Sequence, residues 1–238
     1  MERKKAALCL RGGISKVCGR LNHAGALYNN SPYVKYEYVY NSIMKHIINT
    51  NPEYDIDIFI HCWNTDLQDS LVSLYKPVKY IFEDNSKYVD EINAHCKSPD
   101  DFGGISQSIT MKKVIELKEQ YGIDNNINYD IIILFRPDVL IWKDITLSNY
   151  DLNYLYIDGS GDFGGDIYFI MSSEHASKFK DLYLSLGKGN THKVHSWIRN
   201  YILNICKIPA RMDNIIPGKD IEILRKVDGR SEILKQYM

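Results

Sequence analysis

The segment YDIIILFRPD, residues 129–138, joins an apolar run of strand length to an abrupt charged turn. The run is apolar without alternation, which is typical of a strand covered on both faces. Pro137 has no N–H and favours an extended Arg136, so the strand is expected to end there and to place Asp138 at its carboxyl edge. Ligands of open α/β sheets bind at that edge. Arg136 and Asp138 suit an anionic ligand such as a diphosphate and a divalent cation, whereas the structural alternative makes Asp138 only a turn or cap residue.

Other apolar segments alternate between strand and helix patterns. Further strands are expected at residues 6–10, 57–63, 78–82, 154–157 and 166–170. Helical spacing predicts helices over residues 34–48, 106–121, 174–186 and 195–205. Ser106 is expected to cap the second of these helices and Gly122 to stop it. The alternation predicts an α/β fold with a mostly parallel central sheet flanked by helices.

The chain is expected to form one cytoplasmic domain. Its 238 residues are 45% hydrophobic and 25% charged, which is ordinary for one globular α/β domain, and no Pro- or Ser-rich linker divides them. No apolar run approaches the roughly 20 residues that span a membrane, and the apolar stretch after the basic start is too short for a signal peptide. Five scattered cysteines without a C-x-x-C pair argue against a disulfide framework or a structural zinc site.

The charge of the chain is unevenly distributed. The net charge is -1, yet the last fifty or so residues carry about twice as many Lys and Arg as Asp and Glu. Residues from about 187 to 238 are therefore expected to form a helical, basic C-terminal extension of the domain 1–238. One interpretation is a surface that meets an anionic acceptor or makes peripheral contact with a membrane face. The alternative is an ordinary solvated surface.

A four-residue sequence with two glycines occurs twice in the chain. The sequence DFGG occurs at residues 101–104 and again at 162–165, each time just before a structured element. Four matched residues do not indicate a structural repeat. One interpretation is that both glycine pairs let the backbone approach the same ligand, and the alternative is coincidence.

Five segments carry a resemblance to a known family. They are ALCLRGG (7–13), DIFIHCW (57–63), SQS (106–108), YDIIILFRPD (129–138) and DIYFIMSS (166–173). In this order they resemble the nucleotide-sugar-dependent glycosyltransferases of capsule, lipopolysaccharide and large-DNA-virus glycan pathways. The resemblance covers roughly residues 5–205 and depends on order and spacing rather than on any single motif. It implies a GT-A fold, a Rossmann-like three-layer α/β/α arrangement, and for a viral chain it implies the host cytoplasm.

The resemblance also implies site residues. Asp138 stands in the Asp-x-Asp metal motif of these enzymes, with Arg136 in place of the first carboxylate, and is the expected ligand of Mn²⁺ or Mg²⁺. The loop after the first strand and the end of the 57–63 strand are expected to face the donor. The residues implied for nucleotide-sugar binding are Arg11, Gly12, Gly13, Lys16, His61, Trp63 and Arg136. Where relatives carry His-Pro-Glu, this chain has HSW at residues 195–197.

The chemistry of sugar transfer explains these residue types. Breaking the bond between sugar and phosphate develops charge on the diphosphate, which a metal ion or fixed cations stabilise. Arg11, Lys16 or Arg136 would neutralise phosphate directly. If the reaction inverts the anomeric carbon, the acceptor hydroxyl needs a base. Asp166 is the candidate and Asp162 the second choice.

Each candidate also has a structural interpretation. Asp166 would simply begin a strand, His61 would be a hydrogen-bonded core residue, and Trp63 would cover the core. We expect Asp138→Ala to abolish transfer while leaving thermal stability nearly intact. We also expect Asp166→Asn to lower turnover more than donor affinity.

The leading functional hypothesis is transfer of a sugar from a nucleotide-diphosphate sugar to a glycan or glycoconjugate acceptor, as in glycan biosynthesis. The alternatives are a sugar nucleotidyltransferase and a catalytically degenerate module that binds nucleotide sugars. A dinucleotide-dependent oxidoreductase is disfavoured because the first loop lacks G-x-G-x-x-G. The P-loop lysine motif is absent too, and no nucleic-acid-binding module is present.

Overall fold

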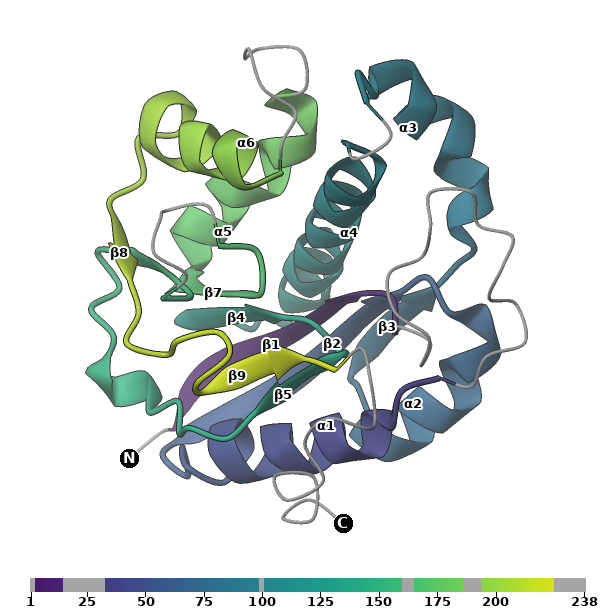
Figure 1. Cartoon of the computed structure of the whole chain (residues 1–238). Helices are drawn as coiled ribbons and strands as arrows, with labels where there is room; N and C mark the ends of the chain where they lie inside the picture. The colour runs from purple at the N-terminus through teal and green to yellow at the C-terminus, as the bar shows by residue number, and fades with distance from the viewer. Residues whose placement is uncertain (1–2, 15–32, 99–100, 160–164, 186–193, 225–238) are drawn as a thin grey trace.

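A mostly parallel sheet lies at the centre of the computed structural model, which describes residues 3–14, 33–98, 101–159, 165–185 and 194–224 (Figure 1). Within these residues the sheet has seven strands in the order β3-β2-β1-β4-β7-β6-β8. Its strands are β1 (Lys4–Gly12), β2 (Tyr54–Cys62), β3 (Lys79–Phe82), β4 (Ile131–Phe135), β6 (Leu155–Ile157), β7 (Tyr168–Ser172) and β8 (Ala210–Met212). Only β7 among them runs antiparallel to its neighbours, β4 and β6. The predicted α/β fold with a mostly parallel sheet is confirmed.

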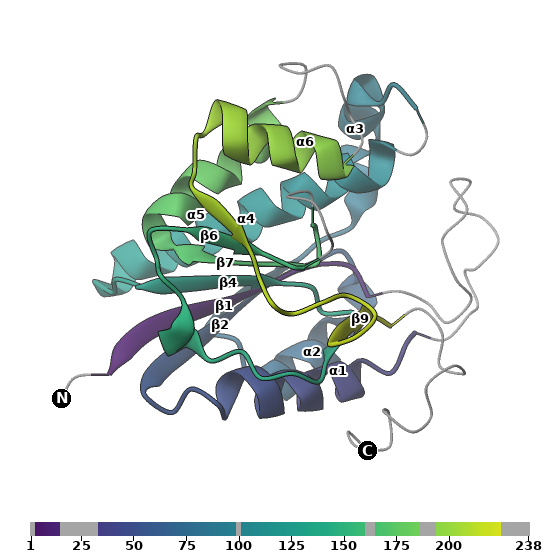
Figure 2. The ribbon, with the colours of Figure 1, turned by 60° about the vertical axis from the view of Figure 1, so that its left-hand side comes forward.

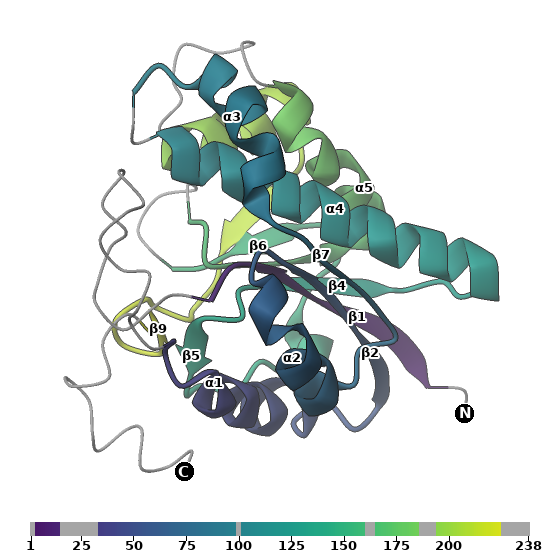
Figure 3. The same cartoon turned by 90° about the vertical axis from the view of Figure 1, so that its right-hand side faces the viewer.

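Helices cover both faces of the sheet. The helices are α1 (Tyr36–Ile43), α2 (Gln68–Tyr75), α3 (Val89–His95), α4 (Asp101–Asn125), α5 (Ser173–Phe179) and α6 (Val194–Asn200). The π-helical turns Met44–Ile48 and Tyr201–Ile205 continue α1 and α6, and 3-10 turns lie at Thr65–Leu67, Asn85–Tyr88, Leu147–Asn149 and Lys180–Ser185. Figures 2 and 3 show α1 and α2 below the sheet and α3 to α6 above it. The described residues therefore form three layers.

Strand β4 shows why its apolar run does not alternate. All five of its residues are buried, at 1% exposure or less. Ile131, Ile133 and Phe135 belong to the hydrophobic cluster on the α1 face. Ile132 and Leu134 belong to the cluster on the α4 face. Each such side chain contributes about 1.5–3 kcal/mol when fully buried, so this strand is a central element of both cores.

Helix α4 differs from its prediction at both ends. It begins at Asp101, so Ser106 lies inside the helix and does not cap it. The Asp101 carboxylate instead accepts hydrogen bonds from the amide nitrogens of Lys97 and Ser98, at 2.8 and 2.9 Å. The helix also continues past Gly122, and Asn126 follows its end with a φ of 52°. The stop predicted at Gly122 is therefore wrong, because the turn that ends α4 lies several residues later.

The C-terminal residues join both sheets. Within residues 194–224, α6 is followed by β8, which pairs with β6 in the central sheet. Strand β9 (Ile221–Ile223) then pairs with β5 (Val139–Ile141) in a separate two-stranded sheet near α1 (Figure 1). The segment expected to be a helical extension thus contributes strands as well as a helix. None of the helices in the described residues is long and apolar enough to cross a bilayer.

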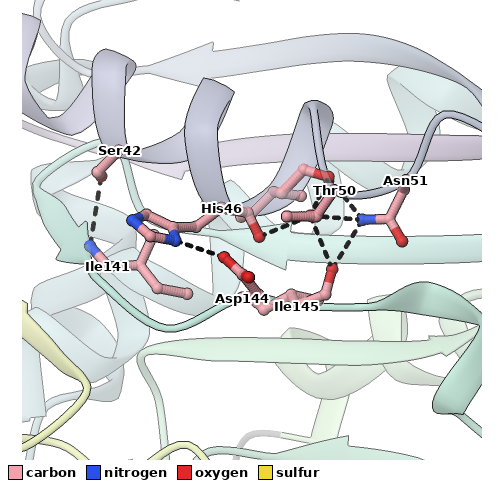
Figure 4. A network of polar contacts seen from close by, with 8 residues as sticks. Ser42, His46, Thr50, Asn51, Ile141, Asp144 and Ile145 are labelled. Atoms are coloured by element: carbon pink, nitrogen blue, oxygen red, sulfur yellow. Dashed lines mark hydrogen bonds and ion pairs between the residues drawn. The ribbon is translucent and has the colours of Figure 1, made fainter.

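A polar network closes the amino edge of the sheet, where β2 begins (Figure 4). Asn51 is 1% exposed and donates to the carbonyls of Ile47 and Ile145, at 2.6 and 2.7 Å. Its own side-chain oxygen accepts from the Leu147 amide at 2.6 Å. His46 contacts Asp144 at 2.6 Å between Nδ1 and Oδ1. These bonds fasten the segment after β5 to the helix layer.

Candidate functional site

The candidate residues gather at the carboxyl edge of the sheet because of the strand directions. Strands β1, β2 and β4 run parallel, so their ends meet at one edge. In the register, Arg11 lies beside His61, and Leu10 lies beside Phe135, the residue that precedes Arg136. Strand β7 runs the opposite way and therefore begins at this edge, two residues after Asp166. Four segments that are distant in sequence thus come together.

Arg136 and Asp138 form a bidentate ion pair across Pro137. Arg136 Nε donates to Asp138 Oδ1 and Nη2 donates to Oδ2, both at 2.9 Å. The Asp138 side chain is 1% exposed and that of Arg136 is 18% exposed. Burial lowers the pKa of Arg136, but the charge and hydrogen bonds of Asp138 outweigh it and raise that pKa above its ordinary value. The arginine is therefore a fixed cation that solvent can still reach.

Arg11 lies deeper than Arg136. It is 1% exposed, and its guanidinium carbon lies 6.0 Å from the centre of the Phe169 ring. Burial, aided by the positive charge of Arg136, lowers the pKa of Arg11 to about 9, against the opposing effect of nearby carboxylates. Arg11 remains a cation at neutral pH. Its Nε has no hydrogen-bond partner within the described parts of the chain.

Asp166 connects the two arginines. Its backbone carbonyl accepts from Arg11 Nη2 at 2.5 Å and from Gln107 Nε2 at 3.1 Å. Its carboxylate Oδ2 lies 4.0 Å from Arg136 Nη1, and its side chain is 16% exposed. The backbone of Asp166 is therefore fixed from inside the protein while its carboxylate remains accessible beside a cation.

Asp158 is a member of this cluster that the sequence interpretation missed. It follows β6, is fully buried, and accepts a hydrogen bond from the Ile167 amide at 3.2 Å. It also raises the pKa of Arg11 through its charge. The rule that selected Asp138, a carboxylate near the carboxyl end of a buried strand, would have selected Asp158 too.

The glycines of the repeated DFGG sequence meet different partners. A Cβ atom at Gly165 would overlap the Asp158 carboxylate. A Cβ atom at Gly104, inside α4, would lie 2.8 Å from the Cβ of Val194 in α6. Gly104 therefore permits helix packing and Gly165 permits contact with a buried carboxylate.

His61 and Trp63 lie at the neighbouring end of β2. His61 is fully buried, and its Nε2 contacts Glu83 Oε1 at 2.9 Å. Glu83 also pairs with Lys113 at 2.8 Å and accepts from Tyr88 at 3.0 Å. The Trp63 ring meets the His61 ring edge-on, with centroids 4.7 Å apart. Both residues thus have protein partners, as their structural interpretation predicts.

The pKa shifts of His61 and Glu83 follow from their contacts. Burial lowers the pKa of His61, although Glu83 opposes this effect. Burial would raise the pKa of Glu83, but hydrogen bonds from His61, Lys113 and Tyr88 lower it to about 2. Glu83 is therefore ionised across the physiological range, and its negative charge is balanced locally.

The glycine loop after β1 docks on the end of β2. Gly12 has a φ of 107°, which glycine adopts without strain. A Cβ at Gly13 would lie 3.2 Å from Asn64 Oδ1, the same atom that accepts from the Ile14 amide at 2.6 Å. The loop is thus held by Asn64. Lys16 and Asp162, which were predicted to bind phosphate and to act as second-choice base, lie outside the described residues.

Arg11 and Arg136 lie close to the carboxylates of Asp138, Asp158 and Asp166 at this edge. Asp138 with Asp166 offers the oxygen ligands that Mg²⁺ and Mn²⁺ prefer, although Arg136 occupies both Asp138 oxygens. No group of three His, Cys, Asp or Glu side chains is arranged to hold a metal in the part of the chain that the structure describes.

Comparison with known proteins does not place the chain in a family. No protein-family model matches the sequence, and no curated protein matches it significantly.

Proposed function

We propose that this protein is a glycosyltransferase that moves a sugar from a nucleotide-diphosphate sugar to a glycan or glycoconjugate acceptor. The observation that supports the proposal most strongly is the contact set of Arg136, Asp138 and Asp166 at the carboxyl edge. A partly exposed cation stands beside a partly exposed carboxylate there. The transfer reaction needs both kinds of charge, a cation at the departing diphosphate and a carboxylate that takes the proton of the acceptor hydroxyl.

In this proposal each residue has a distinct role. Arg136 binds the diphosphate, and Asp138 holds Arg136 in place. A Mn²⁺ or Mg²⁺ ion bound through Asp138 would supply further positive charge at the diphosphate. Arg11, which is too deeply buried to contact a phosphate in this arrangement, adds positive charge from beneath Asp166.

The proposed transfer, written for inversion, is balanced without another reactant. The acceptor oxygen forms a bond to the anomeric carbon and its proton passes to the Asp166 carboxylate. The bond between the anomeric carbon and the phosphate oxygen breaks, and its electron pair leaves with the nucleoside diphosphate. Negative charge thus grows next to Arg136 as it disappears from Asp166, so the two changes are coupled electrostatically.

The test is release of nucleoside diphosphate from a panel of UDP and GDP sugars, with and without Mn²⁺ and with glycan acceptors. We expect release by the wild type and a loss of roughly 100-fold or more in Arg136→Met, because a fixed cation is removed from the leaving group. Asn51→Ala at the opposite edge is the control and should keep its turnover. Pyrophosphate formation from a nucleoside triphosphate would instead identify a sugar nucleotidyltransferase.

A degenerate binding module is the second candidate, and one observation favours it. Both oxygens of Asp138 are bonded to Arg136, so the carboxylate of the metal motif is already neutralised within the protein. For such a module we expect nucleotides to raise the melting temperature without any release of nucleoside diphosphate. A thermal-shift screen of nucleotides, run beside the release assay, separates the two candidates.

A further inference from the structure

A single peptide group is held by three side chains from different parts of the fold. The carbonyl oxygen of Asp166 accepts from Arg11 of β1 and from Gln107 of α4, at 2.5 and 3.1 Å. The N–H of the same peptide group, which belongs to Ile167, donates to Asp158 at 3.2 Å. Both ends of the peptide group are therefore fixed. We call Arg11, Gln107 and Asp158 the peptide clamp.

The clamp determines where the Asp166 side chain points. The orientation of a peptide plane sets the backbone dihedrals of the two residues it joins, and these dihedrals set the direction of the Cα–Cβ bond. Asp158 fixes the residue before as well, since its carboxylate leaves no room for a Cβ at Gly165. The backbone is thus constrained on both sides of Asp166.

The sheet itself does not need this clamp. Strand β7 begins at Tyr168, and its pairing with β6 is already made by Tyr156 with Ile170 and by Ile157 with Phe169. A neutral residue at 158 would leave these backbone pairs intact. Asp158 is fully buried, and a buried carboxylate is costly to remove from water. It lies here against the backbone on both sides of Asp166, at the Ile167 amide and at Gly165.

We propose that Asp158 is a positioning residue, which acts through the peptide clamp to aim the Asp166 carboxylate at the acceptor hydroxyl. This inference rests on the proposed function, in which Asp166 takes the proton of the acceptor. In this role Asp158 does not contact the substrate and affects the rate by way of Asp166. Gln107 acts in the same way from α4.

The first test is a kinetic cycle with Asp158→Ala, Asp166→Asn and the double variant. We expect Asp158→Ala to lower kcat by roughly 100-fold with the donor KM changed little, as for a small misplacement of a reacting group. In the double variant the loss of kcat should equal that of Asp166→Asn alone, because the carboxylate that the clamp positions is then absent. Asp158→Asn, which keeps an oxygen to accept from the Ile167 amide, should recover part of the rate.

Two further variants keep this test decisive. Gln107→Ala removes a partly exposed member of the clamp and should also lower kcat, even if Asp158→Ala does not fold. Asn51→Ala removes a comparable buried bond, in which the Leu147 amide donates to the Asn51 side-chain oxygen at the amino edge, and should leave kcat unchanged. The inference would be overturned if Asn51→Ala lowered kcat as much as Gln107→Ala does. It would also be overturned if the loss in the double variant equalled the product of the losses in Asp158→Ala and Asp166→Asn.

The second test does not need turnover. Hydrogen exchange followed by NMR should show the Ile167 amide protected in the wild type and in Asn51→Ala, but exchanging at least tenfold faster in Asp158→Ala and faster in Gln107→Ala. Unchanged exchange at Ile167 would overturn the clamp whatever the kinetics show. If the wild type releases no diphosphate from any sugar nucleotide, the proposed function fails, and the exchange rates alone decide whether Asp158 fixes Asp166.

Discussion

The two edges of the central sheet both bury polar side chains, but they use them differently. At the amino edge the main bonds run from neutral side chains such as Asn51 to the backbone of a neighbouring loop (Figure 4). At the carboxyl edge charged side chains contact one another, and Arg136 and Asp166 stay partly exposed. Within the described residues the carboxyl edge also holds a buried arginine Nε without a hydrogen-bond partner and an arginine whose pKa is shifted by burial and by nearby charges, features that gather at functional sites.

The largest expected effect is on stability, from Arg11→Met. This change leaves three carboxylates with one guanidinium and removes a donor from the peptide clamp, so the free energy of unfolding should fall by about 3–5 kcal/mol. Urea denaturation measures it. The control is Arg211→Met, which removes an exposed guanidinium stacked on Tyr154, and it should change little. If Arg11→Met lowers the free energy of unfolding no more than the control does, the distinction between the two edges is wrong.

Asp138→Ala comes next and revises an expectation from the sequence. Its carboxylate is buried and bonded twice to Arg136, so its removal should lower stability by about 3 kcal/mol as well as abolish transfer. The double variant Arg136→Met/Asp138→Leu should regain part of the stability but none of the transfer, because an apolar pair replaces the ionic one. Chemical denaturation and diphosphate release measure the two effects. Full stability in Asp138→Ala would show that the pair is not formed.

Asn51→Ala tests the amino edge. It removes three donated bonds and one accepted bond, and should cost about 2 kcal/mol in the free energy of unfolding because buried backbone groups lose their partners. The increase in melting temperature caused by nucleotides should stay the same. A variant that lost nucleotide binding would mean that the two edges are coupled.

The pH dependence of stability should reveal the smallest of these effects, at the Glu83 cluster. The folded pKa of Glu83, about 2, lies below its ordinary value of 4.5, so its contribution is complete above pH 4.5 and is lost as the pH falls toward 2. Between pH 4.5 and about 3.5 the loss should be about 1 kcal/mol. The lowered pKa of His61 acts in the same direction, starting below its ordinary value of 6.5.

Glu83→Gln is the matched variant for this measurement. The difference in unfolding free energy between wild type and Glu83→Gln should be largest near neutral pH and should shrink as the pH falls below 4.5. A difference that stays constant over that range would show that Glu83 has an ordinary pKa in the folded protein.

The long elements of the fold could be predicted because their sequences carry their own pattern. The apolar run of β4 indicated a strand buried on both faces, and Pro137 indicated its end. The carboxyl edge followed from strand direction, so Arg11, Arg136 and Asp138 were expected together. Bonding within the cluster could not be predicted, because the bidentate pair depends on side-chain geometry that residue spacing does not specify.

The two short strands near the C-terminal end of the described chain were not predictable. Strands β8 and β9 are three residues each, and Arg211 and Met212 of β8 are exposed, so neither strand shows a periodic pattern. Strands β8 and β9 form because they pair with β6 and β5, so tertiary contacts rather than local sequence determine them. Asp158 could have been selected by the rule that selected Asp138, but its contacts could not be predicted. Its three-residue strand looked ordinary, and its partner, the Ile167 amide, is a backbone group that no sequence motif marks.

The pairing of β9 with β5 has a consequence for biosynthesis. The carbonyl oxygen of Asp138 accepts from the Leu224 amide at 2.7 Å, so the backbone of this residue gains its last partner from a segment made more than eighty residues later. A nascent chain released from the ribosome only as far as α6 would expose the outer edge of β6 and leave β5 without its companion strand. Translation that stalls between α6 and β8 should therefore yield an aggregation-prone intermediate whose first half is native-like. Binding of chaperones to the nascent chain should be greatest just before β8 and β9 emerge.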